Sequence, residues 1–186
     1  MTDFPNWFDI TAKANFEQVF VKKLKTDKNL RGLQIGTYTG DATEWLMNNT
    51  KMSLIDVDTW GGSEEVSHED IDFNEVEVYY DSRHSDNPRV TKYKGTSDSF
   101  FAQYDGEPFD FIYIDGDHTA TQTAIDGLQA LKVLKPGGII AFDDLTWQSG
   151  KGPYYDPKPG IDAVFHIGQS ILENFIANGQ AWFTKK

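Results

Sequence analysis

Phe109-Asp-Phe-Ile-Tyr-Ile114 runs directly into Asp115-Gly-Asp-His118, and Leu134-Lys-Pro-Gly-Gly-Ile-Ile-Ala-Phe142 runs into Asp143-Asp144. Apolar runs of this kind, rich in β-branched and aromatic residues, are typical of strands buried on both faces of a parallel sheet. In open α/β sheets, ligands bind beyond the carboxyl ends of such strands. Four aspartates and a histidine at those ends are more charge than a fold needs, and they indicate a functional site.

The composition excludes several classes of protein. The 186 residues carry 17 lysines and arginines against 29 aspartates and glutamates, a formal net charge of −12. This charge repels phosphate backbones and anionic membranes, so we expect neither nucleic acid nor a membrane as a partner. The chain has no cysteine, which excludes disulfides and thiolate zinc sites. Because no apolar run is long enough to span a membrane and no secretory signal is visible, we expect a cytoplasmic protein.

Hydrophobic periodicity predicts a single domain over residues 1–186. An N-terminal helical segment, 1–28, contains a helix over about residues 10–25. An Asn178-Gly179 turn between two apolar stretches predicts a C-terminal antiparallel hairpin. The other strands are expected at 30–35, 52–57, 89–93, 109–114 and 134–142, with helices between them. The predicted fold class is therefore α/β: a doubly wound, mostly parallel, Rossmann-like sheet of seven strands that the hairpin completes.

Two irregular segments are expected to form loops beside the site. Residues 61–89 contain two glycines and an acidic run, with one helix around Val76 to Tyr80. Residues 146–160 are rich in proline and glycine, and helical character resumes at Ile161. Aromatic residues in these loops are expected to border an acceptor molecule, with residues 147–160 as a lid. These aromatic residues are Trp60, Trp147, Tyr154 and Tyr155.

Gly36-Thr-Tyr-Thr-Gly40 stands between a predicted strand and a predicted helix. Glycines allow the backbone to approach a ligand closely, and a helix N-terminus offers free N–H groups. The spacing differs from the GxGxxG dinucleotide fingerprint and from the phosphate loop. By itself this motif is either a cofactor loop or an ordinary tight turn.

Asp58 ends the strand that follows the glycine motif. A carboxylate about 20 residues after such a loop is placed to accept hydrogen bonds from ribose hydroxyls. Asp56, two residues earlier, is the fallback for this role. The other interpretation of Asp58 is a solvent-exposed strand end.

Together these features resemble the class I S-adenosylmethionine-dependent methyltransferases. The resemblance extends from about Leu30 to Lys185, and it is closest to the small stand-alone branch with Ile-Asp-Gly-Asp-His, which is related to the metal-dependent catechol and macrolide-sugar O-methyltransferases. It rests on five elements in order: Leu33-Gln-Ile-Gly-Thr-Tyr-Thr-Gly40, Asp58-Thr-Trp60, Gly95-Thr-Ser97, Phe109-Asp-Phe-Ile-Tyr-Ile-Asp-Gly-Asp-His118 and Leu134-Lys-Pro-Gly-Gly138.

The resemblance implies that S-adenosylmethionine (SAM) is the cofactor. The residues from Gly36 to Gly40 match those that wrap its methionine part, Asp58 matches the ribose ligand, and Ser97 and Asp98 match residues that border the adenine. Gln34 stands where the family usually has an acidic residue facing the cofactor's ammonium, and it brings a hydrogen bond without a charge. The implied cofactor-binding residues are Gln34, Gly36, Thr37, Tyr38, Gly40, Asp58, Trp60, Ser97, Asp98, Asp115, Asp117 and His118.

Asp115, Asp143 and Asp144 form the expected metal site. Three carboxylates at two adjacent strand ends repel one another unless they are protonated or bridged by a cation, and oxygen ligands suit Mg²⁺ or Ca²⁺. The metal-dependent O-methyltransferases place an Asp and an Asp-Asn or Asp-Asp pair at matching positions, which implies an ion that lowers the pKa of the acceptor hydroxyl. The alternative is that Asp143 or Asp144 caps the following loop and only Asp115 meets a ligand.

Asp115 and His118 are the expected catalytic residues. Imidazole titrates near working pH, so His118 is a candidate general base. It is equally a candidate for capping the next helix or packing on the cofactor. The remaining histidines have no matching partners in the sequence and are interpreted as surface residues: His68, His84 and His166.

The expected activity is methyl transfer from SAM to a hydroxyl of a small sugar or phenolic acceptor, assisted by Mg²⁺. Two other functions stay open at this point. A non-catalytic nucleotide- or SAM-binding module has no need of the aspartates, and a nicotinamide-dependent oxidoreductase is disfavoured by the glycine spacing. The first helix is a candidate contact for a homodimer.

Overall fold

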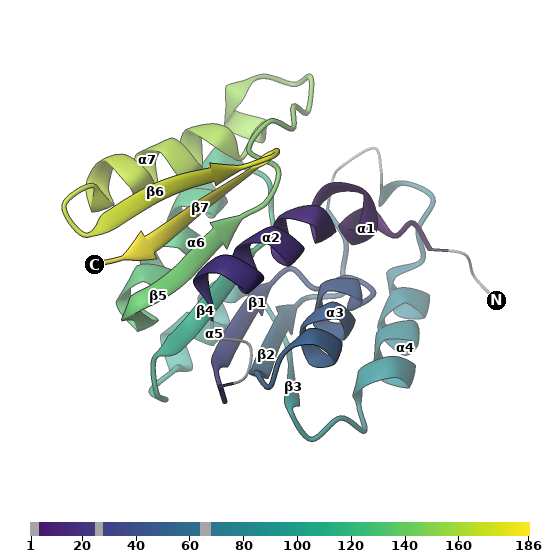
Figure 1. Ribbon diagram of the computed structural model, residues 1–186. Helices are drawn as coiled ribbons and strands as arrows, with labels where there is room; N and C mark the ends of the chain where they lie inside the picture. Colours follow the sequence, from purple (N-terminus) through teal and green to yellow (C-terminus); the bar gives the residue numbers. More distant parts are fainter. Residues whose placement is uncertain (1–3, 25–27, 64–67) are drawn as a thin grey trace.

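The computed structural model describes residues 4–24, 28–63 and 68–186 (Figure 1). The strands are β1 Arg31–Ile35, β2 Ser53–Asp58, β3 Val90–Lys94, β4 Phe109–Ile114, β5 Leu134–Phe142, β6 Leu172–Ala177 and β7 Gln180–Lys185. The helices are α1 Trp7–Thr11, α2 Lys13–Lys23, α3 Asp41–Asn49, α4 Phe73–His84, α5 Ser97–Gln103, α6 Ala120–Val133 and α7 Lys158–Gly168, with a short 3-10 helix, η2, at Pro153–Tyr155. Among the described residues, none of these helices is both long and apolar enough to cross a membrane.

The seven strands form one sheet in the order β3-β2-β1-β4-β5-β7-β6. Neighbouring strands from β3 to β5 are parallel, whereas β7 is antiparallel to both β5 and β6. Asn178 and Gly179 join the two strands of the C-terminal hairpin, and Gly179 has the left-handed φ of 72° that this turn requires. The predicted fold class is confirmed.

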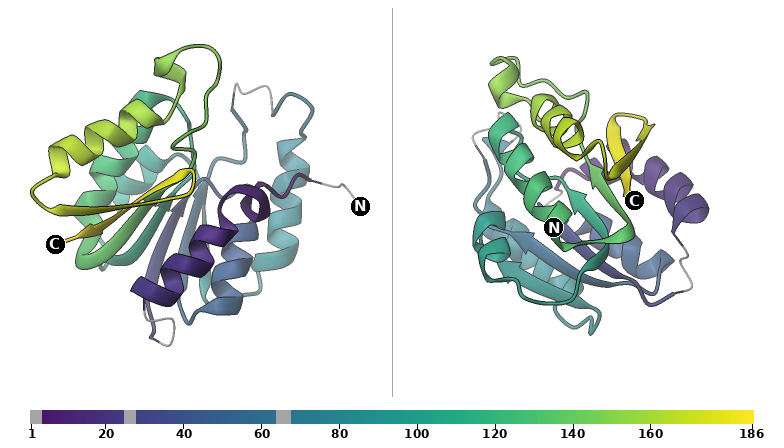
Figure 2. Two further views of the ribbon diagram at one scale, coloured as in Figure 1. Left: turned by 45° about the horizontal axis from the view of Figure 1, so that its top comes forward. Right: turned by 90° about the vertical axis from the view of Figure 1, so that its left-hand side faces the viewer.

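Helices cover both faces of the sheet, which explains why its central strands are apolar throughout. Figures 1 and 2 show α2 and α3 over one face and α6 and α7 over the other. Along β4, Phe111 and Tyr113 pack toward α2 and α3, whereas Ile112 and Ile114 pack into the cluster that contains α6 and α7. A strand with both sides buried has no polar face, so its sequence does not alternate.

The N-terminal segment forms two helices where the sequence predicts one helix over about residues 10–25. The backbone changes direction at Ala12, between α1 and α2. Asn6 caps α1 by accepting a hydrogen bond from the backbone N–H of Asp9 at 2.9 Å. The apolar face of α2 packs on its own sheet through Phe16 and Phe20, so this face is not available to a second subunit. Residues 1–3 and 25–27 of the predicted segment lie outside the described residues.

Both segments expected to be loops contain more helix than the sequence predicts. Residues 61–89 include the whole of α4, and residues 64–67 of this segment lie outside the described part of the chain. Residues 146–160 include η2 and the start of α7, which begins three residues before Ile161. The prolines of this segment predict a loop, but Pro159 stands in the first turn of α7. A proline is tolerated there because its missing N–H costs no hydrogen bond.

Replacing Phe16 should show how much the N-terminal segment contributes to the core. Its ring is fully buried and packs against Phe20, Phe111 and Trp182. We expect Phe16→Ala to lower the free energy of unfolding by about 3–5 kcal/mol in urea denaturation. Ile10→Ala is the control, because Ile10 is 79% exposed and should change stability by about 0.5 kcal/mol at most. Equal effects of the two substitutions would contradict this packing.

Candidate functional site

A cavity of about 740 Å³ lies at the carboxyl ends of β1, β2, β4 and β5. This is the sheet edge at which the sequence predicts the site. The predicted site residues that line the cavity are Gly36, Thr37, Tyr38, Asp58, Ser97, Asp98, Asp115, Asp117, His118, Asp143 and Asp144. Three other predicted residues, Gln34, Gly40 and Trp60, are not among its lining residues.

Asp58 holds the glycine loop, which we define as residues 36–40, in its shape. Its Oδ2 accepts hydrogen bonds from the backbone N–H groups of Thr37 at 2.7 Å and Tyr38 at 2.9 Å. Its Oδ1 accepts one from the backbone N–H of Trp60 at 2.7 Å. A carboxylate has about four acceptor positions, so roughly one is left for a ligand. The side chain predicted to bind ribose therefore also builds the loop.

Gly36 brings the glycine loop against the carboxyl end of β4. It has a φ of 79°, and a Cβ atom there would lie 1.9 Å from the carbonyl oxygen of Asp115. A side chain at this position is excluded on both grounds. The loop and Asp115 are consequently in direct backbone contact.

Gln34 and Trp60 lie behind the glycine loop, so the structure does not support their predicted contacts with the cofactor. Gln34 is 2% exposed, and its amide donates a hydrogen bond to the carbonyl of Gly36 at 3.0 Å. Trp60 is 4% exposed, and its indole N–H donates to the carbonyl of Tyr38 at 2.9 Å. Both side chains support the loop from inside the protein, which the spacing of a motif does not reveal.

Four residues form what we call the acid cluster: Asp115, His118, Asp143 and Asp144. His118 Nε2 lies 3.0 Å from Asp144 Oδ2 and 3.8 Å from Asp115 Oδ1. Asp144 has a left-handed backbone with a φ of 55°, so the chain leaves the extended conformation of β5 there. His118 is thus part of the cluster as well as of the cavity wall.

Asp143 points toward a buried phenol. The hydroxyl of Tyr113 donates a short hydrogen bond to Asp143 Oδ2, and Asp143 Oδ1 accepts the backbone N–H of Asp144 at 2.8 Å. Burial, reinforced by the charge of Asp143, raises the pKa of Asp115 well above its usual range. Burial and the charge of Asp144 also raise the pKa of Asp143. These carboxyls therefore hold protons more tightly than free carboxyls, or require a cation beside them.

The residues able to share one ion differ from the predicted set. Among the described residues, Asp115, His118 and Asp144 each offer one ligand atom, and these atoms lie within 4.8 Å of one another. His118 takes the place that the sequence gives to Asp143, because the Asp143 side chain is held by Tyr113. Carboxylate oxygens with an imidazole suit several divalent cations, Mg²⁺ and Mn²⁺ among them.

Two further segments complete the cavity wall. On one side, Trp7 of α1 packs its ring on Tyr38 with 4.6 Å between ring centroids. On the other, Trp147 packs on His118 at 4.9 Å, and Tyr155 also lines the cavity. Tyr154 is 58% exposed and does not contribute to the wall. The sequence does not predict that α1 lines the cavity, because the helical pattern of apolar residues becomes regular only after Trp7.

Two more side chains of the site escape prediction from the sequence. Asp126 lines the cavity from α6, where it is 1% exposed and accepts a hydrogen bond from Gln122 at 3.0 Å, and burial raises its pKa to about 6. The feature of the sequence that could have identified Asp126 is an aspartate within an otherwise apolar helical stretch. His84 is 3% exposed, so its interpretation as a surface residue is wrong, whereas His68 is half-buried and lines the cavity. His166 is exposed, as expected.

Asp56, the alternative candidate for ribose binding, is buried inside the protein. It is fully buried, and its Oδ2 accepts hydrogen bonds from Thr43 at 2.8 Å and Tyr80 at 2.7 Å. Burial raises its pKa to about 7. Asp56 and Asp58 lie on the same face of β2, but Asp56 is two residues inside the strand, under Thr43 of α3 and Tyr80 of α4, whereas Asp58 ends the strand, where the cavity begins.

Comparison with protein families finds one match. Residues 33–145 match a family described as a methyltransferase domain. The matched range includes the glycine loop, Asp58 and the whole acid cluster. No curated protein matches the chain.

Solved structures share the fold over almost the whole chain. The O-methyltransferase from Bacillus cereus, in complex with SAH, superposes with a TM-score of 0.67 at 20% identity over 99% of this chain and 83% of that one. The SAH-bound methyltransferase PaMTH1 from Podospora anserina gives 0.65 at 19% identity, over 100% and 83%. The O-methyltransferase TomG from Streptomyces achromogenes, in complex with SAM, gives 0.62 at 16% identity, over 95% and 81%.

Titration of Asp56 should make stability depend on pH. Its pKa is raised from 3.8 to about 7, so the folded state binds this proton more tightly than the unfolded chain does. The resulting stabilisation is complete below about pH 4 and is lost as the pH rises through 7. Relative to Asp56→Asn, the wild type should therefore lose about 2–3 kcal/mol between about pH 5 and pH 8. Urea denaturation of both proteins at the two pH values measures this difference, and a constant difference would contradict it.

Proposed function

The chain belongs to a family of methyltransferase domains, and we propose that it transfers a methyl group from SAM to a hydroxyl oxygen of a small-molecule acceptor. The observation that carries this proposal is a single cavity that contains both the glycine loop and the acid cluster. Similarity of fold to O-methyltransferases solved with SAH or SAM supports it. A methyl donor held by the loop would stand next to a hydroxyl held by the cluster.

The glycine loop and Asp58 suit the methionine and ribose parts of SAM. Gly36 presents backbone without a side chain to the cavity, and Asp58 keeps one acceptor position for a ribose hydroxyl. Ser97 and Asp98, at the start of α5, line the cavity and are proposed to border the adenine. Asp117 also lines it, with Oδ1 accepting the backbone N–H of Thr119 at 2.7 Å.

His118 and Asp115 are proposed to receive the proton of the acceptor. As the O–CH₃ bond forms and the S–CH₃ bond breaks, the hydroxyl loses its proton to one of these side chains. Asp144 Oδ2, 3.0 Å from His118 Nε2, would stabilise the imidazolium that forms if His118 accepts this proton. The protein forms no covalent bond with either substrate in this reaction. Most of the rate enhancement is therefore expected from holding the methyl donor and the hydroxyl in position.

Mg²⁺ fits the acid cluster. Burial and mutual repulsion raise the pKa of Asp115 and Asp143, and a cation would relieve the cost of ionising them. Asp115 and Asp144 would supply carboxylate oxygens and water would complete the set, so that His118 Nε2 stays available for the proton of the acceptor. Bound there, the ion would lower the pKa of the acceptor hydroxyl.

The walls of the cavity favour a flat or ring-shaped acceptor, such as a phenol or a sugar. Trp7 and Trp147 line it, one near the glycine loop and the other beside the acid cluster. Aromatic side chains bind the faces of phenols by stacking and pack against the apolar faces of sugars. Residues 147–160 remain our proposed lid over this acceptor.

Binding of S-adenosylhomocysteine (SAH) tests the cofactor assignment. At about 100 times its dissociation constant, SAH should stabilise the protein by about 2.7 kcal/mol in thermal-shift titrations. NAD should not stabilise it, because the glycine loop lacks the dinucleotide spacing. Asp58→Ala should abolish the SAH effect, since it removes the ribose ligand and three hydrogen bonds that hold the loop. Stabilisation by NAD and not by SAH would overturn the proposed function.

Removal of divalent cations tests the metal. EDTA should abolish methylation of a catechol probe, and Mg²⁺ should restore it. Calorimetry should detect Mg²⁺ binding to the wild type and a loss of about tenfold or more in Asp144→Ala, with Asp117→Asn unchanged as a control that lines the same cavity. Full activity in EDTA, with no heat of Mg²⁺ binding, would exclude a role for the ion.

A further inference from the structure

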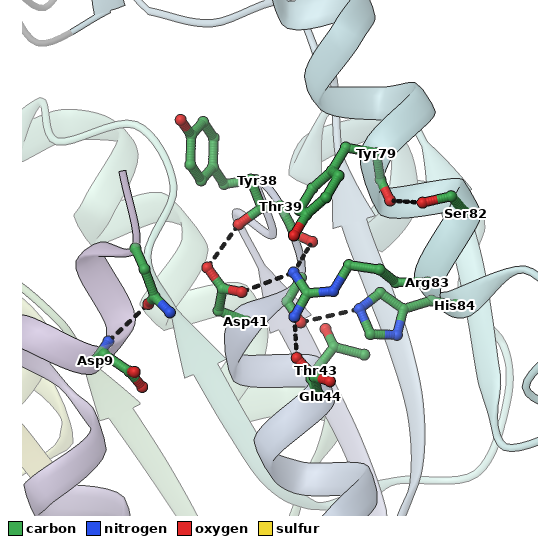
Figure 3. Close-up of polar contacts among 12 residues, drawn as sticks. Asp9, Tyr38, Thr39, Asp41, Thr43, Glu44, Tyr79, Ser82, Arg83 and His84 are labelled. Carbon is green, nitrogen blue, oxygen red and sulfur yellow. Dashed lines mark hydrogen bonds and ion pairs between the residues drawn. The ribbon is translucent and has the colours of Figure 1, made fainter. Parts of the chain in front are cut away.

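Arg83 and His84, at the C-terminal end of α4, contact the glycine loop and the start of α3 (Figure 3). Arg83 Nη1 donates hydrogen bonds to the carbonyl of Thr39 at 2.9 Å and to Asp41 Oδ1 at 2.7 Å. Its Nη2 makes a short ion pair with Glu44. The Arg83 side chain is only 16% exposed, and its guanidinium lies over the ring of Tyr79 at 5.2 Å. One side chain thus ties α4 to the loop and to the first turn of α3.

His84 makes a second contact between α4 and the glycine loop. Its Nε2 lies 3.0 Å from the carbonyl oxygen of Gly40, which fixes Nε2–H as the donor of a hydrogen bond. Burial, and then the charge of Arg83, lowers the pKa of His84, so its ring stays neutral near pH 7 although Glu44 and Asp41 also face it. A Cβ atom on Gly40 would lie 2.5 Å from His84 Nε2. The approach is possible only because residue 40 is glycine.

The loop depends on these contacts because it has few others at its end. Gly40 is the N-cap residue of α3 and has no side chain with which to cap the helix. It adopts a left-handed φ of 80°, which glycine alone adopts without cost. Arg83 and His84 donate hydrogen bonds to the carbonyls of Thr39 and Gly40, and the Gly40 carbonyl also accepts the backbone N–H of Glu44 at 2.9 Å. Asp58 fixes the start of the loop, and α4, a helix within the segment 61–89, fixes its end.

We propose that Arg83 and His84 are positioning residues that preset the glycine loop for SAM, so that the C-terminal end of α4 influences the affinity for the cofactor without lining the cavity. This inference rests on the proposed function. Neither residue lines the cavity, and each acts through a backbone carbonyl of the loop. If the loop adopts its binding shape only a tenth of the time once α4 is released, the apparent dissociation constant for SAM rises about tenfold.

Calorimetric titration with SAH separates positioning from general stability. Arg83→Gln should weaken SAH binding about tenfold, with a matching rise in the KM for SAM and a small change in kcat. The matched control is Glu77→Gln, which removes the ion pairs of α4 with Lys92 and Lys94 but leaves the loop contacts intact. It should change SAH affinity by less than about twofold. Equal affinities of the two variants for SAH would overturn the inference.

Milder variants keep the test valid if Arg83→Gln does not fold. Arg83→Lys keeps the charge but replaces the planar guanidinium, whose two Nη atoms reach Thr39, Asp41 and Glu44, by a single nitrogen, and should show a smaller loss in the same direction. His84→Gln keeps an N–H donor for Gly40 and should retain most of the affinity, whereas His84→Leu should lose it. Equal binding by His84→Gln and His84→Leu would also overturn the inference. A wild type that does not bind SAH would refute the proposed function instead.

Discussion

The site depends on the carboxylate of Asp58. It accepts three backbone N–H groups, from Thr37, Tyr38 and Trp60. Tyr38 and Trp60 have left-handed backbones with φ values of 53° and 46°, which cost large side chains energy unless other contacts impose them. Asp58 supplies those contacts, and the Trp60 indole adds one to the carbonyl of Tyr38. The carboxylate of Asp58 therefore holds two large residues in an unfavourable backbone conformation, one of them in the loop that we propose to bind SAM.

Parallel pairing brings this loop to the acid cluster. Beyond the strand ends, backbone hydrogen bonds continue from Gly36 to Val57, from Asp115 to Ile35 and from Asp143 to Ile114, each at 2.8–2.9 Å. Residues that follow β1, β4 and β5 are thereby held side by side, although Gly36 is 79 positions before Asp115 and 107 before Asp143. This arrangement also buries several carboxyl groups, and burial makes their ionised forms less stable. The hydroxyls of Tyr113 and Tyr80 offset part of this cost at Asp143 and Asp56.

Much of the fold and part of the candidate site are predictable from the sequence. The central strands are recognisable because both of their faces are buried, and the aspartates at their ends are recognisable because charge is rare there. Gln34 and Trp60 have the expected positions in the chain but lie behind the loop, because a motif does not say toward which side a side chain points. Trp7 and His84 carry no local signal of their roles, since each acts on residues distant in the sequence, whereas Asp126 stands out as an aspartate within an apolar helical stretch.

The sequence by itself determined the order of strands and helices, the hairpin at Asn178-Gly179 and the sheet edge at which charge gathers. These follow from local preferences and periodicity, which act over a few residues. Only the tertiary structure decided that His118 joins Asp115 and Asp144, that Tyr113 holds Asp143, and that α4 grips the glycine loop through Arg83. Such contacts depend on how separate elements pack and which side chains are buried together, and no short stretch of sequence records that.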